Sequence, residues 1–205
     1  MMLRSLSAAM VLAGVFAAAA ACGRSPAAPS TNSTASIVSS QSAPEASAAG
    51  PALMTVSQGR TNIMVNMHDA CDPDTFNAVI GPGTCVRNGG VTFDLFVAQL
   101  TAHQSVGAWH FAPGVANASV GETFLASNTG GEVHTFTEVA QFGGGIVPFL
   151  NQLAGTPNVA PECKALEPDD FVAPGTTYQE AVNHSGTLKF QCCIHPWMRL
   201  EATVR

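Results

Sequence analysis

The sequence predicts an all-β domain built as an antiparallel β-sandwich, with one long irregular insertion. Three observations favour this class. Short segments of alternating apolar and polar residues recur from residue 55 onward, turn-forming residues separate them at short intervals, and few stretches have helical periodicity. Many short strands between turns are typical of sandwiches.

Length and charge limit the possible functions. The chain has 205 residues. About 150 remain once an N-terminal segment that cannot fold is set aside, enough for one domain with a sizeable core. From residue 55 onward, six Lys or Arg residues stand against thirteen Asp or Glu residues. This acidic balance argues against nucleic acid as a partner, because binding to phosphates needs an excess of positive charge.

The N-terminus has the features of an export signal. Arg4 precedes an apolar run over residues 8–21, which is too short for a stable membrane span. We predict a signal peptide at 1–21 that resembles a bacterial lipoprotein signal, because small residues precede Cys22. Acylation of Cys22 would anchor the protein on the periplasmic side of the cell envelope, and Gly23 favours the outer membrane. The alternative is simple cleavage near Ala21 with release of the protein.

Residues 22–54 are rich in Ala, Ser and Pro and have almost no charge. Such a segment cannot bury enough apolar surface to fold, so we predict a disordered tether. A flexible coil of this length has a mean span of roughly 30 Å, which would let an anchored domain at 55–205 reach partners near the membrane.

The first elements of the domain follow in order. Residues 61–67 alternate and predict a strand. A compact loop then carries Cys71 and Cys85 at its two ends, with one helical turn expected between them. Two cysteines that frame a loop in an exported protein indicate a disulfide, and closing about fourteen residues would stabilise the fold by about 3 kcal/mol. Metal binding by these cysteines with His68 is the alternative, but the spacing does not support it.

Further strands are expected at residues 91–100, 108–113 and 120–128. The pattern breaks between residues 141 and 175, where three consecutive glycines precede a Pro-rich segment with several acidic side chains. Phe149, Leu150 and Leu153 predict one short helix there. A long loop within a compact domain is usually functional or mobile.

The final strand leads into a loop that carries three potential metal ligands. Cys192 offers a thiolate, His195 an imidazole three residues later, and Met198 a thioether three residues after that. Soft sulfur ligands favour copper, and two His with one Cys and a weak axial Met form a blue-copper site. The second His is provided by His134, which follows a Gly-Gly turn and begins an alternating segment.

The segments Asn-x-Gly-Gly-x-x-His-Thr-Phe-Thr and Phe-x-Cys-x-Ile-His-Pro-Trp-Met resemble the cupredoxin family of plastocyanin and amicyanin. This resemblance implies a Greek-key sandwich and one mononuclear type 1 copper ion held by His134, Cys192, His195 and Met198. It also implies that Asn128 ties the two ligand loops together by hydrogen bonds.

The same resemblance implies electron transfer, with redox partners docking at an apolar patch through which His195 reaches the surface. Pro196 and Trp197 provide apolar surface beside it. The chain departs from the family in its long insertion and in Cys193, which follows the ligand Cys.

Spacing favours Cys192 over Cys193 as the ligand, because only Cys192 forms Cys-x-x-His with His195. Neighbouring side chains of a strand point to opposite faces, so Cys193 would point away from the metal. If Cys22 is acylated and Cys71 pairs with Cys85, the remaining thiols are Cys163 and Cys193. We therefore predict that these two form a disulfide, although connectivity does not follow from sequence alone.

The sequence gives less support to another metal or to two other functions. Zinc prefers Cys and His sets, and Met198 counts against it. A module for periplasmic copper delivery or storage is the alternative to electron transfer, but delivery sites are Met- or His-rich and this chain has no such tract. An enzyme is not expected, because four ligands leave no open position. His68, His103, His110 and His184 are expected to be structural or exposed.

Overall fold

The computed structural model describes residues 61–205. The signal peptide predicted at 1–21, the tether at 22–54 and the acylation site Cys22 lie outside the described residues. Strands make up most of the regular structure, and helices are few. Within the described part of the chain, no helix has the length and apolar character needed to cross a membrane.

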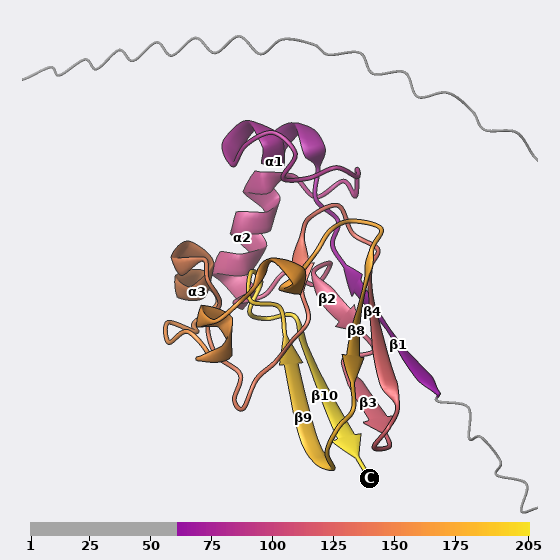
Figure 1. Ribbon diagram of the computed structural model, residues 1–205. Coiled ribbons are helices and arrows are strands. Elements are labelled where there is room, and N and C mark those ends of the chain that lie inside the picture. The colour runs from indigo at the N-terminus through magenta and orange to yellow at the C-terminus, as the bar shows by residue number, and fades with distance from the viewer. Residues whose placement is uncertain (1–60) are drawn as a thin grey trace, which may run out of the picture. The chain divides into compact units, whose positions relative to one another are not determined.

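Two four-stranded sheets form the body of the domain (Figure 1). The first has the order β2-β1-β4-β8 and consists of β1 (Asn62–His68), β2 (His110–Ala112), β4 (Thr123–Asn128) and β8 (Thr177–Ala181). The second has the order β3-β10-β9-β6 and consists of β3 (Val115–Ala118), β10 (Arg199–Val204), β9 (Gly186–Gln191) and β6 (Thr137–Glu138). A separate pair joins β5 (His134–Thr135) to β7 (Phe171–Val172).

The sheets are mixed, so the prediction of an antiparallel sandwich is confirmed only in part. β1 runs parallel to β4, and β10 runs parallel to β3, whereas β9 and β10 form an antiparallel hairpin. Alternation of side chains along a strand shows which residues face the core but not which strand lies next to it. The parallel pairs therefore had no signature in the sequence.

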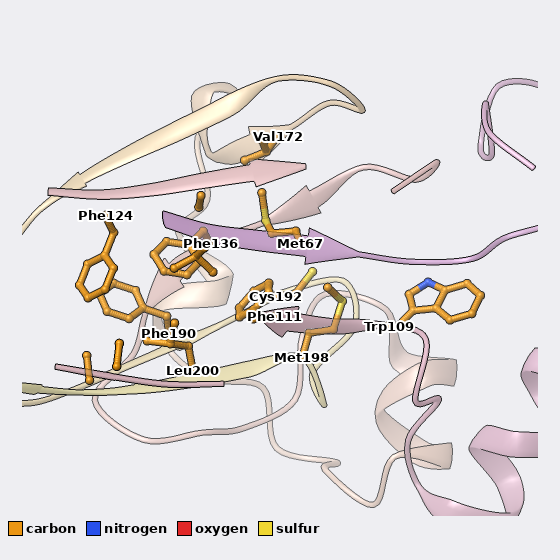
Figure 2. Packing of buried hydrophobic residues seen from close by; sticks show 14 of the residues in the cluster. Met67, Trp109, Phe111, Phe124, Phe136, Val172, Phe190, Cys192, Met198 and Leu200 are labelled. Carbon is orange, nitrogen blue, oxygen red and sulfur yellow. The ribbon is translucent and has the colours of Figure 1, made fainter. Parts of the chain in front are cut away.

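The core lies between the two sheets (Figure 2). Phe124 of β4 meets Phe190 of β9 with ring centroids 5.1 Å apart, and Phe136 stacks on Phe190 at 4.5 Å. In β10, Leu200, Ala202 and Val204 are buried and alternate with more exposed residues, as expected for a strand with one face on the core. These aromatic contacts pack β9 against the first sheet. The connection from β9 to β10 carries three of the predicted copper ligands.

The helices are α1 (Pro73–Val79), α2 (Phe93–His103), α3 (Pro148–Leu153) and two short 3₁₀ helices, Glu162–Lys164 and Pro168–Asp170. The three α-helices lie together to one side of the strands (Figure 1). α1 begins at its cap Asp72, whose carboxylate accepts a hydrogen bond from the Thr75 amide at 2.9 Å. α1 and α3 fall where a helical turn and a short helix were predicted.

α2 contradicts the strand predicted at residues 91–100. Thr92 caps the helix by accepting a hydrogen bond from the Leu95 amide, and Asp94 lies in the first turn, where a negative charge is favourable. The apolar residues that suggested two partly apolar strand faces form one helical stripe with spacing i, i+3, i+4 and i+7: Phe93, Phe96, Val97 and Leu100. The helical period is therefore present in the sequence, and the prediction of a strand at residues 91–100 was wrong.

Candidate metal centre

Three predicted ligands come from the connection between β9 and β10. Cys192 follows the last residue of β9, and Met198 precedes the first residue of β10. The loop is closed by two backbone hydrogen bonds, from the Met198 amide to the His195 carbonyl at 2.9 Å and from the Cys192 amide to the Met198 carbonyl at 3.0 Å. This tight turn brings two potential metal ligands, Cys192 and His195, to the same side of the loop.

The fourth predicted ligand, His134, begins β5 and reaches the same point from a distant part of the chain. The Sγ atom of Cys192 lies 3.8 Å from Nδ1 of His134 and 3.8 Å from Nδ1 of His195. The three potential ligand atoms all lie within 4.8 Å of one another. The structure thus brings together three side chains that the sequence pattern selected.

Met198 is fully buried next to this group. Its sulfur and that of Cys192 point into the same region, at the end of the core where Trp109 lies (Figure 2). All four side chains are nearly or completely inaccessible to water. A thioether held there is available as a weak axial ligand of a metal bound by the other three.

The distances fit a metal ion between the three donors. With metal–sulfur and metal–nitrogen bonds of about 2.3 and 2.05 Å, a trigonal arrangement separates the sulfur from each nitrogen by roughly 3.8 Å. The observed separations are both 3.8 Å. A His₂Cys trigonal set with a thioether near it is a donor set suited to copper, whereas zinc prefers four strong tetrahedral ligands.

The sulfur of Cys192 is in an environment that favours its thiolate. The backbone amides of Thr135 and His195 each lie 3.4 Å from Sγ. Burial by itself would raise the pKa of the Cys192 thiol, but the imidazoles of His134 and His195 hold it well below its usual value. A thiolate is the form that binds metal.

The carboxylate of Asp69 contacts the ring of His134 at Nε2, the nitrogen that does not face Cys192. Asp69 Oδ2 lies 2.9 Å from His134 Nε2, and both side chains are buried. Burial opposes the charge on His134, but hydrogen bonds to Asp69 and Cys192 outweigh it and raise the pKa of His134 to about 9. Burial likewise opposes the charge on Asp69, but its hydrogen bonds lower the pKa of that carboxyl to about 2. A metal at Nδ1 would take the place of a proton there.

His195 is also backed by a carboxylate. Its Nε2 lies 3.6 Å from Oε2 of Glu132, and the same carboxylate oxygen accepts a hydrogen bond from Trp109 Nε1 at 2.7 Å. Burial raises the pKa of Glu132. The ring of His195 packs near three aromatic side chains: Phe96, Trp109 and Trp197.

His195 does not project through the surface as the resemblance implied. It is 3% exposed, and the ring of Phe96 from α2 lies edge-on to it with centroids 6.5 Å apart. An apolar pocket of about 250 Å³ reaches it instead, with walls from α1, α2 and α3 that include Phe76, Phe93 and Leu150. Residues of all three α-helices therefore line the space beside the β9–β10 loop, an arrangement that the sequence did not predict.

Asn128 orders the loop that precedes His134. Its side-chain amide donates to the carbonyls of Glu132 at 2.7 Å and Val172 at 2.8 Å, and its carbonyl oxygen accepts from the Gly130 amide. These partners lie outside the β9–β10 loop, so Asn128 does not join the two ligand segments as the resemblance implied. That link is made by Thr135, whose hydroxyl accepts a hydrogen bond from the Cys193 amide at 2.8 Å.

Both disulfides predicted from the cysteine pattern are present, Cys71–Cys85 and Cys163–Cys193. In the described residues the only free cysteine is Cys192. The second bridge fastens the 141–175 insertion beside the ligand loop, where the Ile146 amide also donates to the Cys193 carbonyl at 2.6 Å. The insertion is thus an ordered part of the site's surroundings.

Removing the Cys163–Cys193 bridge by the double substitution C163S/C193S should lower the free energy of unfolding by about 3.6 kcal/mol, because the two cysteines are 30 residues apart in the sequence. The measurement is urea unfolding. Hydrogen exchange should quicken in residues 142–165 and stay slow in β4. Unchanged exchange in the insertion would show that the bridge does not hold it.

The remaining histidines lie outside this group. His68 stacks on His110 with ring centroids 4.9 Å apart, and the exposed His184 lies 3.5 Å from Glu138. Asp69, Glu132 and Thr135 were missed as functional residues. Glu132 and Thr135 flank His134 closely in the sequence, which is a usable signal, but nothing in the sequence pointed to Asp69.

No protein-family model matches the chain, and no curated protein matches it. Among solved structures, a novel purple cupredoxin from Nitrosopumilus maritimus is 14% identical over 69% of this chain and 98% of its own, with a TM-score of 0.39. An amicyanin mutant in the reduced state is 20% identical over 45% of this chain and 70% of its own, with a TM-score of 0.31. Another amicyanin mutant, in a Cu(I) structure, is 17% identical over 47% and 73%, with a TM-score of 0.33. Because these likenesses are remote, the functional assignment depends on the geometry of the site.

Proposed function

We propose that this chain is a cupredoxin-like protein with a Greek-key sandwich and a single type 1 copper site that transfers electrons. The observation that carries the proposal is the position of Cys192 Sγ, 3.8 Å from Nδ1 of both His134 and His195. The buried thioether of Met198 completes the set of four ligands. The metal is one mononuclear copper ion.

Copper bound here would supply one-electron chemistry by cycling between Cu(I) and Cu(II). The residues of the chain keep the ligand positions constant during that cycle. Amides of Thr135 and His195 hold the sulfur of Cys192, and the carboxylate of Asp69 holds the ring of His134. We expect no enzymatic function, because four buried ligands would leave a bound copper ion no open position for a substrate.

Electrons would enter or leave through the side of the site that the three α-helices cover. The apolar pocket reaching His195 is bordered by Ile80 and Phe149, which are both at least half exposed. An apolar rim of this kind suits the small, weak contacts between redox proteins. We place this encounter in the periplasm, with the protein tethered to a membrane through Cys22.

An absorption measurement tests the proposal. The purified protein titrated with Cu(II) should develop an intense visible band from thiolate-to-copper charge transfer at one equivalent. The band should disappear on reduction and return on oxidation over repeated cycles. Absence of the band at full loading would overturn the type 1 assignment, and rapid loss of copper to a chelator would favour the delivery function.

A further inference from the structure

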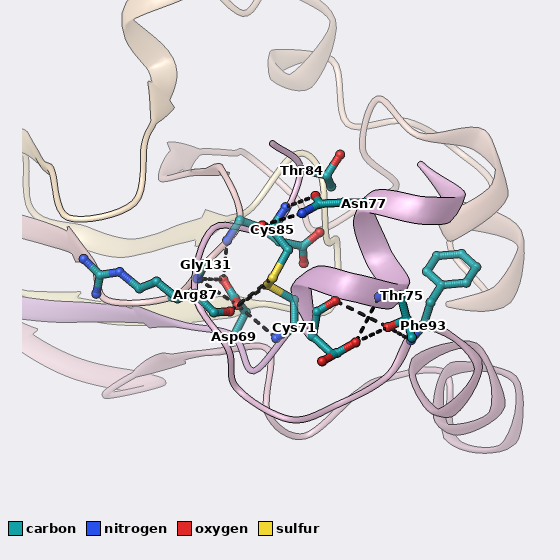
Figure 3. The surroundings of a disulfide bond; sticks show 12 residues. Asp69, Cys71, Thr75, Asn77, Thr84, Cys85, Arg87, Phe93 and Gly131 are labelled. Atoms are coloured by element: carbon teal, nitrogen blue, oxygen red, sulfur yellow. Dashed lines mark hydrogen bonds between the residues drawn. A yellow bond between two sulfur atoms is a disulfide. The ribbon is translucent and has the colours of Figure 1, made fainter. Parts of the chain in front are cut away.

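The side chain of Asp69 is buried, and the groups that contact its oxygens are hydrogen-bond donors. The exposure of the side chain is 1%. Its carboxylate accepts from the Gly131 amide at 2.8 and 2.9 Å, from the Glu132 amide at 3.0 Å and from the Cys71 amide at 3.3 Å. With Nε2 of His134 at 2.9 Å, four donor groups converge on two oxygens. Figure 3 shows two of these neighbours, Gly131 and Cys71, beside Asp69. A carboxylate meets this demand because it is an acceptor only.

The glycines at 130 and 131 leave the space that the side chain of Asp69 and the neighbouring disulfide occupy. A Cβ atom at Gly130 would collide with Asp69 Oδ2, and a Cβ atom at Gly131 would lie 2.8 Å from Cys71 Sγ. The disulfide Cys71–Cys85 holds the segment just after Asp69 (Figure 3). The Gly-Gly pair before His134 therefore leaves space for the side chain of Asp69. We call the backbone amides of Cys71, Gly131 and Glu132 around its carboxylate the cradle.

The contact decides which nitrogen of His134 is free for a metal. Because Asp69 Oδ2 accepts, Nε2 must carry the hydrogen, and Nδ1 is left facing Cys192 Sγ. A carboxylate on the far nitrogen of a ligand histidine fixes its tautomer and makes it a stronger donor. The negative charge of Asp69 would therefore affect a bound ion through the imidazole of His134.

That charge lies in a buried site that already contains a thiolate. Negative charge close to a metal in a low-dielectric interior stabilises its higher oxidation state more than its lower one. The carboxyl group of Glu132 lies 3.6 Å from Nε2 of His195, the other histidine that would hold the ion. Both imidazoles are therefore backed by carboxyl groups.

We propose that Asp69 is a positioning residue for the metal site, which holds His134 in its Nδ1-binding tautomer and shifts the bound copper toward Cu(II). This inference rests on the proposed copper site. The geometry that carries it is the 2.9 Å contact to His134 within the cradle of backbone amides.

The test compares D69N with D74N, since Asp74 is an exposed carboxylate of α1 and D74N removes the same charge away from the site. Loss of an outer partner typically changes metal affinity by 10–100-fold. D69N should lower the preference for Cu(II) over Cu(I) by at least tenfold, which raises the reduction potential by about 59 mV. D74N should leave the potential near that of the wild type. Equal potentials in D69N and the wild type would overturn the inference.

A second measurement uses the unaltered protein and remains decisive if D69N does not fold. In the diamagnetic Cu(I) form, the Nε2 hydrogen of His134 should exchange slowly with solvent and should show the strongly downfield NMR shift of a hydrogen bond to a carboxylate. An Nε2 hydrogen without that shift, or one that exchanges rapidly, would refute the role of Asp69. Failure of the wild type to develop the visible band would instead refute the copper site itself.

Discussion

Substituting Cys192 by serine should abolish the visible copper band completely. The band requires a thiolate bonded to copper, and a serine hydroxyl is neither soft nor ionised at neutral pH. Loss of this ligand should weaken copper binding by more than the 10–100-fold typical of losing an outer partner. Absorption spectroscopy of C192S at one equivalent of copper, with binding followed by competition with a chelator, measures both effects.

The matched control is C193S, made with C163S so that no new free thiol is left. Cys193 is bonded to Cys163 and is no longer a thiol that could bind the metal. The band should persist in the C163S/C193S protein at about its original position. If the band vanished there and survived in C192S, the ligand assignment would be reversed.

Substituting Gly145 by alanine should strongly destabilise the domain. A Cβ atom at this position would collide with the carbonyl group of Cys193, and the atoms that it meets belong to the backbone and cannot rotate away. The hydrogen bond from the Ile146 amide to the Cys193 carbonyl would be lost with the same displacement. Overpacking typically costs about 1–3 kcal/mol, and a clash with backbone atoms is expected at the upper end of that range. Urea unfolding of the metal-free protein measures the loss.

The matched control for G145A is G107A, because nothing lies within 4 Å of a Cβ atom at Gly107. Its free energy of unfolding should stay within about 0.5 kcal/mol of the wild type, as for most surface substitutions. G145A should also broaden or shift the copper band, because Cys193 adjoins the ligand Cys192. Equal stability of the two variants would show that the insertion is not packed against the ligand loop.

Much of the site could be predicted because its signals are local. Cys192, His195 and Met198 lie within seven residues, so their spacing alone shows that they can face one ion. The cysteine pattern likewise led to the two disulfides observed. His134 lies far away in sequence, and only its resemblance to a known ligand segment connected it with the loop.

Other features could not be predicted, because they depend on which segments meet. Asp69 is 65 residues from His134, and no spacing rule joins a residue after β1 to one at the start of β5. The packing of Phe96 near His195 requires α2, a segment whose apolar residues on both faces of a possible strand had suggested a strand. The parallel pairing of β1 with β4 has no local signal either.

The sequence by itself determined the donor types, the order of the ligands within the loop and the choice of Cys192 over Cys193, because these follow from chain connectivity over a few residues. Tertiary structure alone decided that both imidazoles have carboxyl groups behind them and that helices cover His195. These contacts join residues distant in the chain, and they form only when the sheets pack and the buried polar groups must find partners.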